Sequence, residues 1–211
     1  MRSFAVIPGA GLSQRMGTNK LLLPWSDGTL IEHVLRQWER SNVDHIVLVT
    51  RTPIVQGLDK SRWAALQRVH LLTPDPPPQE MKVSVLKALE FISEQWKPEP
   101  TDTWLLAPAD LATLEAHMVD RMLKVFSQAA DQHEMAIPRY HDKRGHPVLF
   151  TWRLAMEVSR LAADENLSSL TEKKFPRLEV AMPGNAPRDL DTWEDYQALM
   201  PEGTRHVTRP G

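Results

Sequence analysis

An apolar run near the N-terminus ends in the sequence IPGAGLSQRMG at residues 7–17, and KLLLP follows at residues 20–24. Three of the chain's nine glycines fall within the first of these stretches. Glycine lets a backbone adopt positive φ and approach a ligand closely, with its N–H groups directed at anionic oxygens. Arg15 and Lys20 add positive charge to the same loop. Such a loop after the first strand of an α/β sheet predicts a phosphate-binding site.

The loop matches neither of the two common phosphate-binding motifs. The sequence GxxxxGK[ST] is absent, and Gly9-Ala10-Gly11 lacks the third glycine of the dinucleotide fingerprint at its required spacing. The residues alone therefore leave a second interpretation open, in which this is a flexible loop whose charges are solvated.

The first half of the chain alternates between predicted strands and predicted helices. Four short apolar runs predict buried strands at Phe4–Pro8, His45–Thr50, Val69–Thr73 and Trp104–Ala107. Apolar side chains at helical spacing occur over Thr29–Arg40, Val85–Trp96 and Leu111–Val125. This alternation predicts an α/β fold of the Rossmann-like, three-layer kind, with a mostly parallel central sheet.

The second half of the chain is less regular. Its expected elements are strands at 135–138 and 147–150 around a polar loop at 139–146, helices at 151–163 and 167–174, a strand at 178–182, and a last helix carrying Trp193, Tyr196 and Met200. We expect a single domain over residues 1–200 and a frayed tail over residues 201–211. The run Pro74–Pro78 predicts a stiff loop. Among the tryptophans, Trp25 lies in a predicted turn and is the one expected to be exposed.

Composition excludes several classes of protein. The 211 residues include 25 Lys and Arg against 27 Asp and Glu, so no basic surface for nucleic acid or an anionic membrane is expected. The chain has no cysteine, which excludes disulfides, thiolate metal sites and cysteine nucleophiles. No apolar run approaches the roughly 20 residues that a membrane-spanning helix needs. We therefore expect a soluble, cytoplasmic protein.

The complete glycine-loop string resembles the signature of the MobA-like nucleotidyltransferases, and its KLLLP continuation is similar to the molybdenum cofactor cytidylyltransferase branch. The resemblance runs from about Phe4 to Leu199. The further segments that match in order are MKVSVL at 81–86, Ala109-Asp110, RGHPVLF at 144–150 and DLDTWEDY at 189–196.

The resemblance implies transfer of a nucleoside monophosphate from an NTP, with CTP favoured, to a phosphorylated acceptor such as molybdopterin, with release of pyrophosphate. It implies that the nucleotide is bound by Gly9, Ala10, Gly11, Ser13, Arg15, Gly17, Lys20 and Ser84. It assigns catalysis to Arg15, Lys20 and Asp110, a Mg²⁺ ion to Asp110 and Asp189, and the acceptor pocket to His146 and Asp191. No nucleic acid or membrane partner is implied.

Each of these residues also has a purely structural interpretation. Asp110 follows a predicted strand, where Asp is a preferred N-cap of the next helix. Asp189 and Asp191 precede the last predicted helix, so they are candidate caps or first-turn acids. His146 is a candidate for a packed, hydrogen-bonded histidine. Neither Ser13 nor Ser84 lies in a nucleophile elbow, so a serine nucleophile is not expected.

The sequence departs from the family pattern at three places. Leu111-Ala112 replaces Gln-Pro or Met-Pro after Asp110, Glu80 replaces a glycine before Met81, and Pro8 replaces an aliphatic residue. The first two departures lie where base and acceptor are expected to be recognised. They leave open another cytidylyl- or sugar-phosphate nucleotidyltransferase, or a non-catalytic nucleotide- or cofactor-binding protein of the same fold.

Overall fold

A single mostly parallel sheet lies at the centre of the computed structural model, which describes residues 1–11, 16–162 and 165–204. The strand order is β10-β7-β9-β6-β1-β4-β5, and β8 pairs with the end of β7. In sheet order the strands are β10 (Arg177–Ala181), β7 (Met135–Tyr140), β9 (Val148–Thr151), β6 (Thr103–Leu106), β1 (Ser3–Pro8), β4 (His45–Val49) and β5 (Val69–Leu72), with β8 at Lys143–Arg144.

Strand direction decides where the carboxyl ends of the strands meet. β1 pairs in parallel with β4 and β6, and β4 pairs in parallel with β5. β9 runs antiparallel to both β6 and β7, and β10 is parallel to β7. As a result, β7 and β10 run in the same direction as β1. The predicted α/β fold with a mostly parallel sheet is therefore confirmed. All strands but β9 and β8 end at one edge of the sheet, and Pro8 of β1 lies at that edge.

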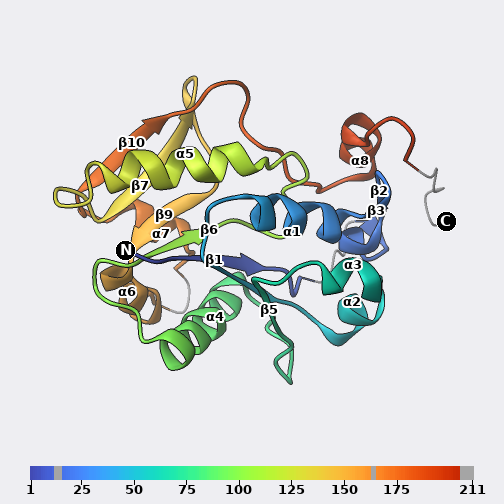
Figure 1. Cartoon of the computed structure of the whole chain (residues 1–211), viewed down its shortest axis with the longest axis horizontal. Coiled ribbons are helices and arrows are strands. Elements are labelled where there is room, and N and C mark those ends of the chain that lie inside the picture. Colours follow the sequence, from blue (N-terminus) through green and yellow to red (C-terminus); the bar gives the residue numbers. More distant parts are fainter. Residues whose placement is uncertain (12–15, 163–164, 205–211) are drawn as a thin grey trace.

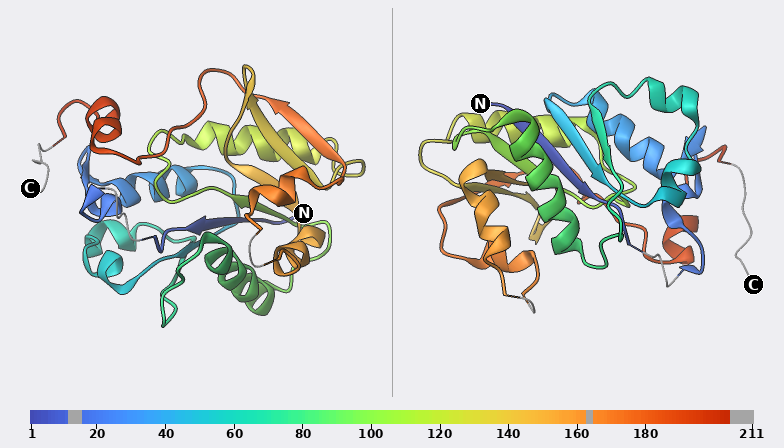
Figure 2. Two further views of the ribbon diagram at one scale, coloured as in Figure 1. Left: turned by 180° about the vertical axis from the view of Figure 1, so that it is seen from behind. Right: turned by 90° about the horizontal axis from the view of Figure 1, so that it is seen from below.

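Helices cover both faces of the sheet (Figures 1 and 2). On one face lie α1 (Leu30–Arg40) and α5 (Ala116–Ser127), and on the other lie α4 (Met81–Trp96) and α6 (Ala155–Ser159). Alternate residues of β1 point to opposite faces, so Ala5 and Ile7 pack with the first pair of helices and Phe4 and Val6 with the second. Two apolar cores result, one on each side of the sheet.

The start of α1 follows from a capping box. Thr29 Oγ1 accepts a hydrogen bond from the Glu32 backbone N–H at 3.4 Å, and the Glu32 carboxylate accepts one from the Thr29 N–H at 2.8 Å. From there Leu30, Val34 and Trp38 form one fully buried stripe, which fixes the face that α1 turns to the sheet.

Several predicted helices have different bounds. The helix expected over Leu111–Val125 begins only at Ala116, because Leu111 forms an isolated antiparallel bridge with Asp189 instead. The helix expected over 151–163 is a 3₁₀ turn, η3 (Trp152–Leu154), followed by the short α6. The polar loop at 139–146 is a hairpin, since β7 continues to Tyr140 and pairs with β8.

Other elements were not predicted from the sequence. Two short helices, α2 (Thr52–Gln56) and α3 (Lys60–Ala64), follow β4, and a two-stranded ribbon of β2 (Pro24–Trp25) and β3 (Gly28–Thr29) precedes α1. The 3₁₀ turn η2 (Lys20–Leu22) was not predicted either. These elements are shorter than apolar periodicity can indicate reliably. The helices expected at 167–174 and around Trp193 and Tyr196 are present as α7 (Ser168–Glu172) and α8 (Trp193–Leu199).

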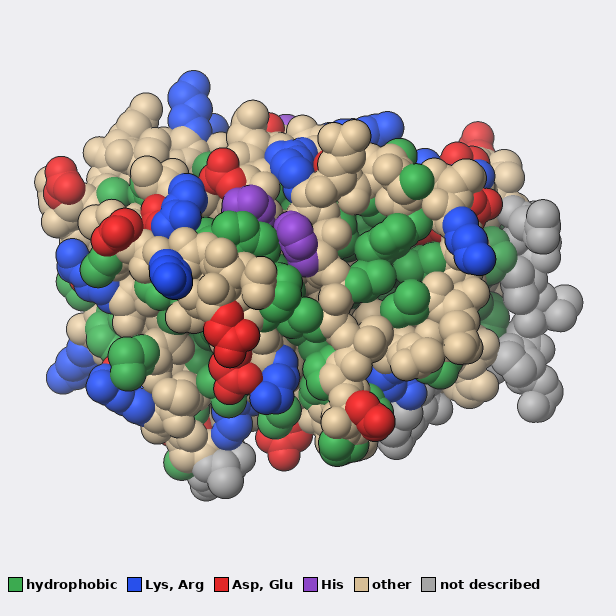
Figure 3. Space-filling view, turned by 60° about the horizontal axis from the view of Figure 1, so that its bottom comes forward, with side chains coloured by type: hydrophobic (Ala, Val, Ile, Leu, Met, Phe, Trp, Pro, Cys, Tyr) green, Lys and Arg blue, Asp and Glu red, His purple; other side chains and the backbone are tan. Residues whose placement is uncertain are grey.

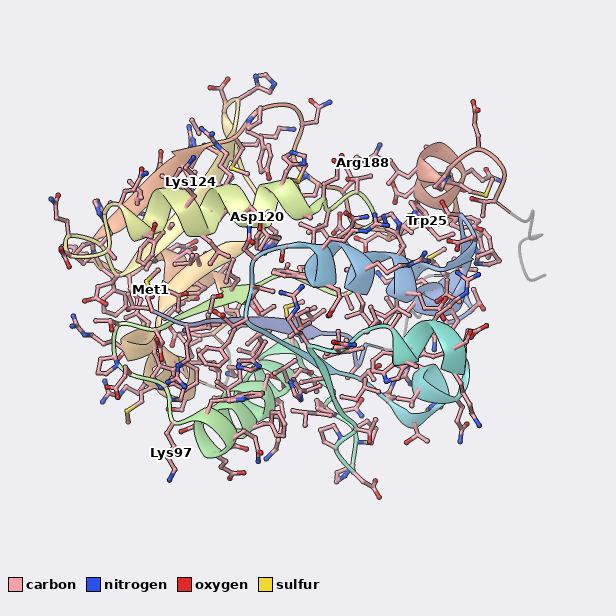
Figure 4. All side chains as sticks on the ribbon, in the orientation of Figure 1. Met1, Trp25, Lys97, Asp120, Lys124 and Arg188 are labelled. Atoms are coloured by element: carbon pink, nitrogen blue, oxygen red, sulfur yellow. The ribbon has the colours of Figure 1, made fainter. Side chains whose placement is uncertain are left out.

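The expectation that Trp25 is exposed is wrong. Its side chain is 2% exposed, and its ring lies 6.2 Å from that of Tyr196 on α8. Tyr196 also donates a hydrogen bond from its hydroxyl to the Pro24 carbonyl at 2.9 Å. Figure 4 labels Trp25 at the end of the molecule where the ribbon and α8 meet. The turn is polar in sequence, but a helix from the far end of the chain covers it.

A frayed tail was expected over residues 201–211, of which the structure describes 201–204, so residues 205–211 lie outside the described residues. Thr204 itself is buried and its Oγ1 accepts a hydrogen bond from the Ser26 N–H at 3.1 Å. In the described part of the chain, no helix combines the length and the apolar character needed to cross a membrane. On the face turned forward in Figure 3, basic and acidic side chains are interspersed.

The junction between the two halves of the sheet depends on one aromatic pair. Phe150 of β9 lies directly opposite Trp104 of β6, with ring centroids 4.4 Å apart and nearly parallel rings. Phe150 is 1% exposed. We expect Phe150→Ala to lower the free energy of unfolding by about 3–5 kcal/mol, because it removes buried apolar area and leaves a cavity.

Urea unfolding followed by circular dichroism measures this change. Met156→Ala is the matched control, since Met156 is 65% exposed and its truncation is expected to change stability by less than about 0.5 kcal/mol. Equal effects of the two variants would contradict the importance of the aromatic pair.

Candidate active site

A cleft of about 600 Å³ lies beyond the carboxyl ends of β1 and β6. Ligands of open α/β sheets bind at this edge, because loops from neighbouring parallel strands converge there. One wall is the glycine loop, a second is the segment after β6, and a third is the start of α4. The cleft is lined by Pro8, Gly9, Ala10, Gly11, Met16, Lys20, Leu21, Pro78, Gln79, Glu80, Met81, Ser84, Pro108, Ala109, Asp110 and Asp191.

The glycine loop is anchored on both sides by neighbouring strands. The Gly9 N–H donates to the Val49 carbonyl at 2.7 Å, and the Thr50 hydroxyl donates to the Gly9 carbonyl at 3.2 Å. A Cβ atom on Gly9 would lie 3.0 Å from Ala109 Cβ and 3.4 Å from the Val49 carbonyl oxygen. Close packing therefore favours glycine at residue 9, before any ligand is considered.

The rest of the loop is described in part. Gly11 faces open space and Gly17 has φ of +64°, a conformation that favours glycine. Ser13 and Arg15, both predicted to bind nucleotide, lie outside the described residues. Arg51 donates a hydrogen bond to the Gly11 carbonyl at 3.0 Å. Arg51 was not predicted as part of the site, although it directly follows a buried strand, as Asp110 does.

Lys20 lies at the centre of the charged end of the cleft. Its ammonium forms an ion pair with Asp110, donates to the Leu190 carbonyl at 2.6 Å, and lies 3.3 Å from Asp191 Oδ1. The Lys20 and Asp110 side chains are 16% and 15% exposed. The structure thus brings together Lys20, Asp110 and Asp191, three of the residues assigned to the site from the sequence.

The cap interpretation of the three aspartates is wrong. The N-cap residue of α5 is Glu115, five positions after Asp110, and that of α8 is Thr192, which forms a capping box with Asp195. Asp110 is instead held at the edge of the sheet, where its carbonyl accepts a hydrogen bond from the Leu190 N–H at 3.2 Å. None of these carboxylates is needed to begin a helix.

Asp189 and Asp191 occupy different places. Asp191 lines the cleft beside Lys20, although the sequence assigned it to the acceptor pocket. Asp189 is exposed, is not among the residues that line the cleft, and pairs through its backbone with Leu111. Arg188, labelled in Figure 4, precedes it on the segment that connects β10 with α8.

His146 has the hydrogen bond expected of a packed histidine. Its Nδ1 lies 3.3 Å from the Leu106 carbonyl, and its own carbonyl accepts a hydrogen bond from the Tyr140 hydroxyl at 3.3 Å. Burial lowers the pKa of His146, while the hydrogen bond to Leu106 and the charges of Asp189 and Asp110 act in the opposite direction. His146 therefore packs against the end of β6 and lies within the electrostatic influence of both carboxylates. Its role toward an acceptor stays a prediction.

The α4 wall carries mostly apolar or internally bonded groups. Ser84 is 2% exposed, and its hydroxyl donates to the Glu80 carbonyl at 3.5 Å. The Gln79 amide donates to the Pro77 carbonyl at 3.2 Å. Met81 is half exposed. The predicted stiff loop at Pro74–Pro78 leads directly into this wall.

The residues at this edge fit a divalent cation that is shared with a phosphate ligand. Within residues 1–11, 16–162 and 165–204, no three His, Asp or Glu side chains gather into a complete metal site. Mg²⁺ needs less than that from a protein, since one or two carboxylates plus phosphate oxygens and waters complete its coordination. Asp110 supplies a hard oxygen donor within the cleft, and Asp189 and Asp191 flank it on the paired segment.

The fold and the cleft place this chain among α/β proteins that bind a ligand beyond the carboxyl ends of parallel strands. The MobA-like NTP transferase domain matches residues 5–179. The chain therefore belongs to the MobA-like NTP transferase family and is a nucleotidyltransferase of that family.

Two relatives are similar over most of the chain. A probable molybdenum cofactor guanylyltransferase of Bacillus mycoides (strain KBAB4) is 21% identical over 173 residues, which cover 77% of this chain and 75% of the relative. A molybdenum cofactor cytidylyltransferase of Escherichia coli (strain K12) is 26% identical over 154 residues, which cover 72% of each.

Crystal structures of Rv0371c from Mycobacterium tuberculosis H37Rv share the fold. One superimposes with a TM-score of 0.76 at 24% identity and covers 94% of this chain and 97% of that chain. The complex of Rv0371C with manganese gives a TM-score of 0.73 at 25% identity, covering 95% and 98%. A protein of the same fold thus binds a divalent metal ion.

The packing around the glycine loop generates a stability prediction. We expect Gly9→Ala to lower the free energy of unfolding by about 1–3 kcal/mol, because the new methyl group is forced against Ala109 and the backbone of β4. Gly11→Ala is the matched control, since nothing described lies within 4 Å of a Cβ there. Chemical denaturation without nucleotide measures both variants. Similar free energies of unfolding for the two variants would contradict this prediction. They would show that the residues around Gly9 rearrange easily to admit a methyl group.

Proposed function

We propose that this protein transfers CMP from CTP to the terminal phosphate of a small phosphorylated acceptor of the molybdopterin kind, with release of pyrophosphate. The observation that supports it best is the ion-paired Lys20, held by Asp110 and Asp191 in a cleft whose other wall is the glycine loop. A lysine and backbone amides next to carboxylates are suited to binding a triphosphate. This arrangement favours phosphate binding over the interpretation of the loop as flexible, with solvated charges.

The reaction needs no covalent enzyme intermediate. An oxygen of the acceptor phosphate attacks the α-phosphorus of the NTP, a new P–O bond forms, and the bond to the leaving pyrophosphate breaks. Catalysis then rests on alignment of the two substrates and on stabilisation of negative charge. Lys20 supplies positive charge within the cleft, and the N–H groups of the glycine loop after Gly9 would hold phosphate oxygens, since the Gly9 N–H is bonded to Val49. Arg15 is proposed to add a second positive charge.

A divalent cation, Mg²⁺ in this proposal, would be held by Asp110 with help from Asp189. When bound it neutralises phosphate oxygens and polarises them as a Lewis acid. Asp191 keeps a carboxylate beside Lys20 in this arrangement and so orients the ammonium. His146 lies near the same carboxylates and is proposed to border the acceptor.

The preference for CTP rests on sequence strings rather than on overall identity. The relatives include both a probable guanylyltransferase and a cytidylyltransferase, at low identity. The strings KLLLP at 20–24 and GHP at 145–147 are those that resemble the cytidylyl branch. We therefore favour CTP, and another cytidylyl- or sugar-phosphate transferase is the alternative within the same chemistry.

The departure from the family pattern at Leu111-Ala112 does not argue against enzymatic activity. Leu111 and Ala112 are 2% and 1% exposed, belong to the core under α1 and α5, and do not line the cleft. The substitution of the family's Gln-Pro or Met-Pro at these residues therefore changes packing behind Asp110 rather than the cleft surface. This favours an enzyme over a non-catalytic binding protein of the same fold.

The direct test is pyrophosphate release from each of the four NTPs with Mg²⁺, in the presence and absence of molybdopterin. We expect release that depends on the acceptor and is at least about tenfold faster with CTP than with GTP or ATP, because a wrong base leaves polar groups of the site unpaired. Fastest release with GTP would make the protein a guanylyltransferase. No release with any NTP would favour the binding-protein alternative.

A second prediction concerns Asp110. We expect Asp110→Asn to reduce kcat/KM by about 100-fold or more, because the amide cannot supply the charge that a divalent cation and Lys20 require. Stability should change by only about 1 kcal/mol, since Asn has the same shape and Lys20 keeps Asp191 and the Leu190 carbonyl as partners.

Activity and urea unfolding are measured on the same samples of Asp110→Asn and of the control Asp131→Asn. Asp131 is exposed and lies outside the cleft, so its change should leave both quantities unaltered. Wild-type turnover in Asp110→Asn would remove Asp110 from the proposed machinery.

A further inference from the structure

The cleft is chemically polarised from one end to the other. Lys20, Asp110 and Asp191 form the charged end, next to the loop amides that suit phosphate. The segment from Pro78 to Ser84 forms another wall, and α4, which it begins, packs on the other face of the sheet from Leu21 and α1. If the triphosphate occupies the charged end, as in the proposed function, this wall is the one left for the base.

Two exposed side chains on this wall can hydrogen-bond a base, Gln79 and Glu80. Pro78 and Met81 carry no strong hydrogen-bonding group, and the buried Ser84 hydroxyl donates to a backbone carbonyl. The Gln79 amide donates to the Pro77 carbonyl and keeps both a donor and an acceptor, so it does not distinguish a base amino group from a base carbonyl. Within the part of the chain that the structure describes, no group donates to the Glu80 carboxylate, which is exposed and makes no cap bond to α4.

The place of Glu80 suits a negatively charged side chain. It is the N-cap residue of the 16-residue helix α4, where the helix dipole favours an anion. A carboxylate there repels a triphosphate, so Glu80 belongs to the base end of the nucleotide. Met81, the next residue, is half exposed and presents a polarisable side chain on which an aromatic ring can lie.

We propose that Glu80 reads the exocyclic amino group of the base and thereby selects CTP over UTP. A carboxylate only accepts hydrogen bonds. The N4 amino group of cytosine donates to it, whereas the O4 of uracil is an acceptor and is repelled. The inference rests on the proposed function, because it takes the cleft to hold an NTP. It also gives the departure at residue 80 a role in place of the usual glycine.

The test is Glu80→Gln, measured by calorimetric binding of CTP and UTP in the presence of Mg²⁺. Glutamine keeps the length of the side chain, and its amide can turn to donate to O4 or accept from N4. We expect the ratio of CTP to UTP affinity to fall by about tenfold. Removal of one negative charge strengthens binding of both nucleotides alike, and this uniform effect cancels in the ratio.

Glu94→Gln is the matched control. Glu94 is exposed near the far end of the same helix, so its change removes the same charge without touching the cleft and should leave the ratio unaltered. An unaltered ratio in Glu80→Gln, with tight CTP binding retained, would overturn the inference and leave the proposed function standing. A wild-type protein that binds neither nucleotide would overturn the proposed function itself.

Discussion

The position of Gly9 is the constraint on which the site depends. Its N–H bonds to the end of β4, and the space for a side chain is taken by Ala109 after β6 and by Leu48. Because three strands end around this one residue, the loop that follows it can only continue over the carboxyl edge of the sheet. The same close approach holds Ala109, and therefore Asp110, against the glycine loop. A cleft with loop amides on one side and a carboxylate on the other is the direct result.

The charges at the Lys20 end of the cleft are paired. Lys20 lies between Asp110 and Asp191, and the Leu190 carbonyl completes its hydrogen bonds. Because three groups share the ammonium, the loss of one leaves it paired, whereas a lone charge at this low exposure would be costly. A lysine held in this way is oriented before any substrate arrives, which is the property that electrostatic stabilisation of a transferring phosphate requires. The segment with Asp189 and Asp191 thus belongs to the site as much as the glycine loop does.

Much of the fold was predictable because buried parallel strands are short, continuous apolar runs. The predicted strands in the first half agree with β1, β4, β5 and β6 to within a residue at either end. Predictions failed where a contact with a distant segment overrode the local pattern. Leu111 is spaced for a helix but pairs with Asp189, and Trp25 lies in a polar turn but is covered by Tyr196. Neither contact leaves a signal within the few residues around it.

The sequence by itself determined the strand–loop–helix alternation, the glycine loop with Lys20, and the acidic residue after a central strand, because each is a local pattern of side-chain type and spacing. Only the tertiary structure decided that Lys20 pairs with Asp191, 171 residues away, while Asp189 does not line the cleft but lies next to Asp110 through its backbone pairing with Leu111. It also placed Arg51 on the loop and Glu80 in the cleft. The physical reason is that the order of strands in the sheet brings segments together that are far apart in the sequence. No local sequence pattern indicates such contacts.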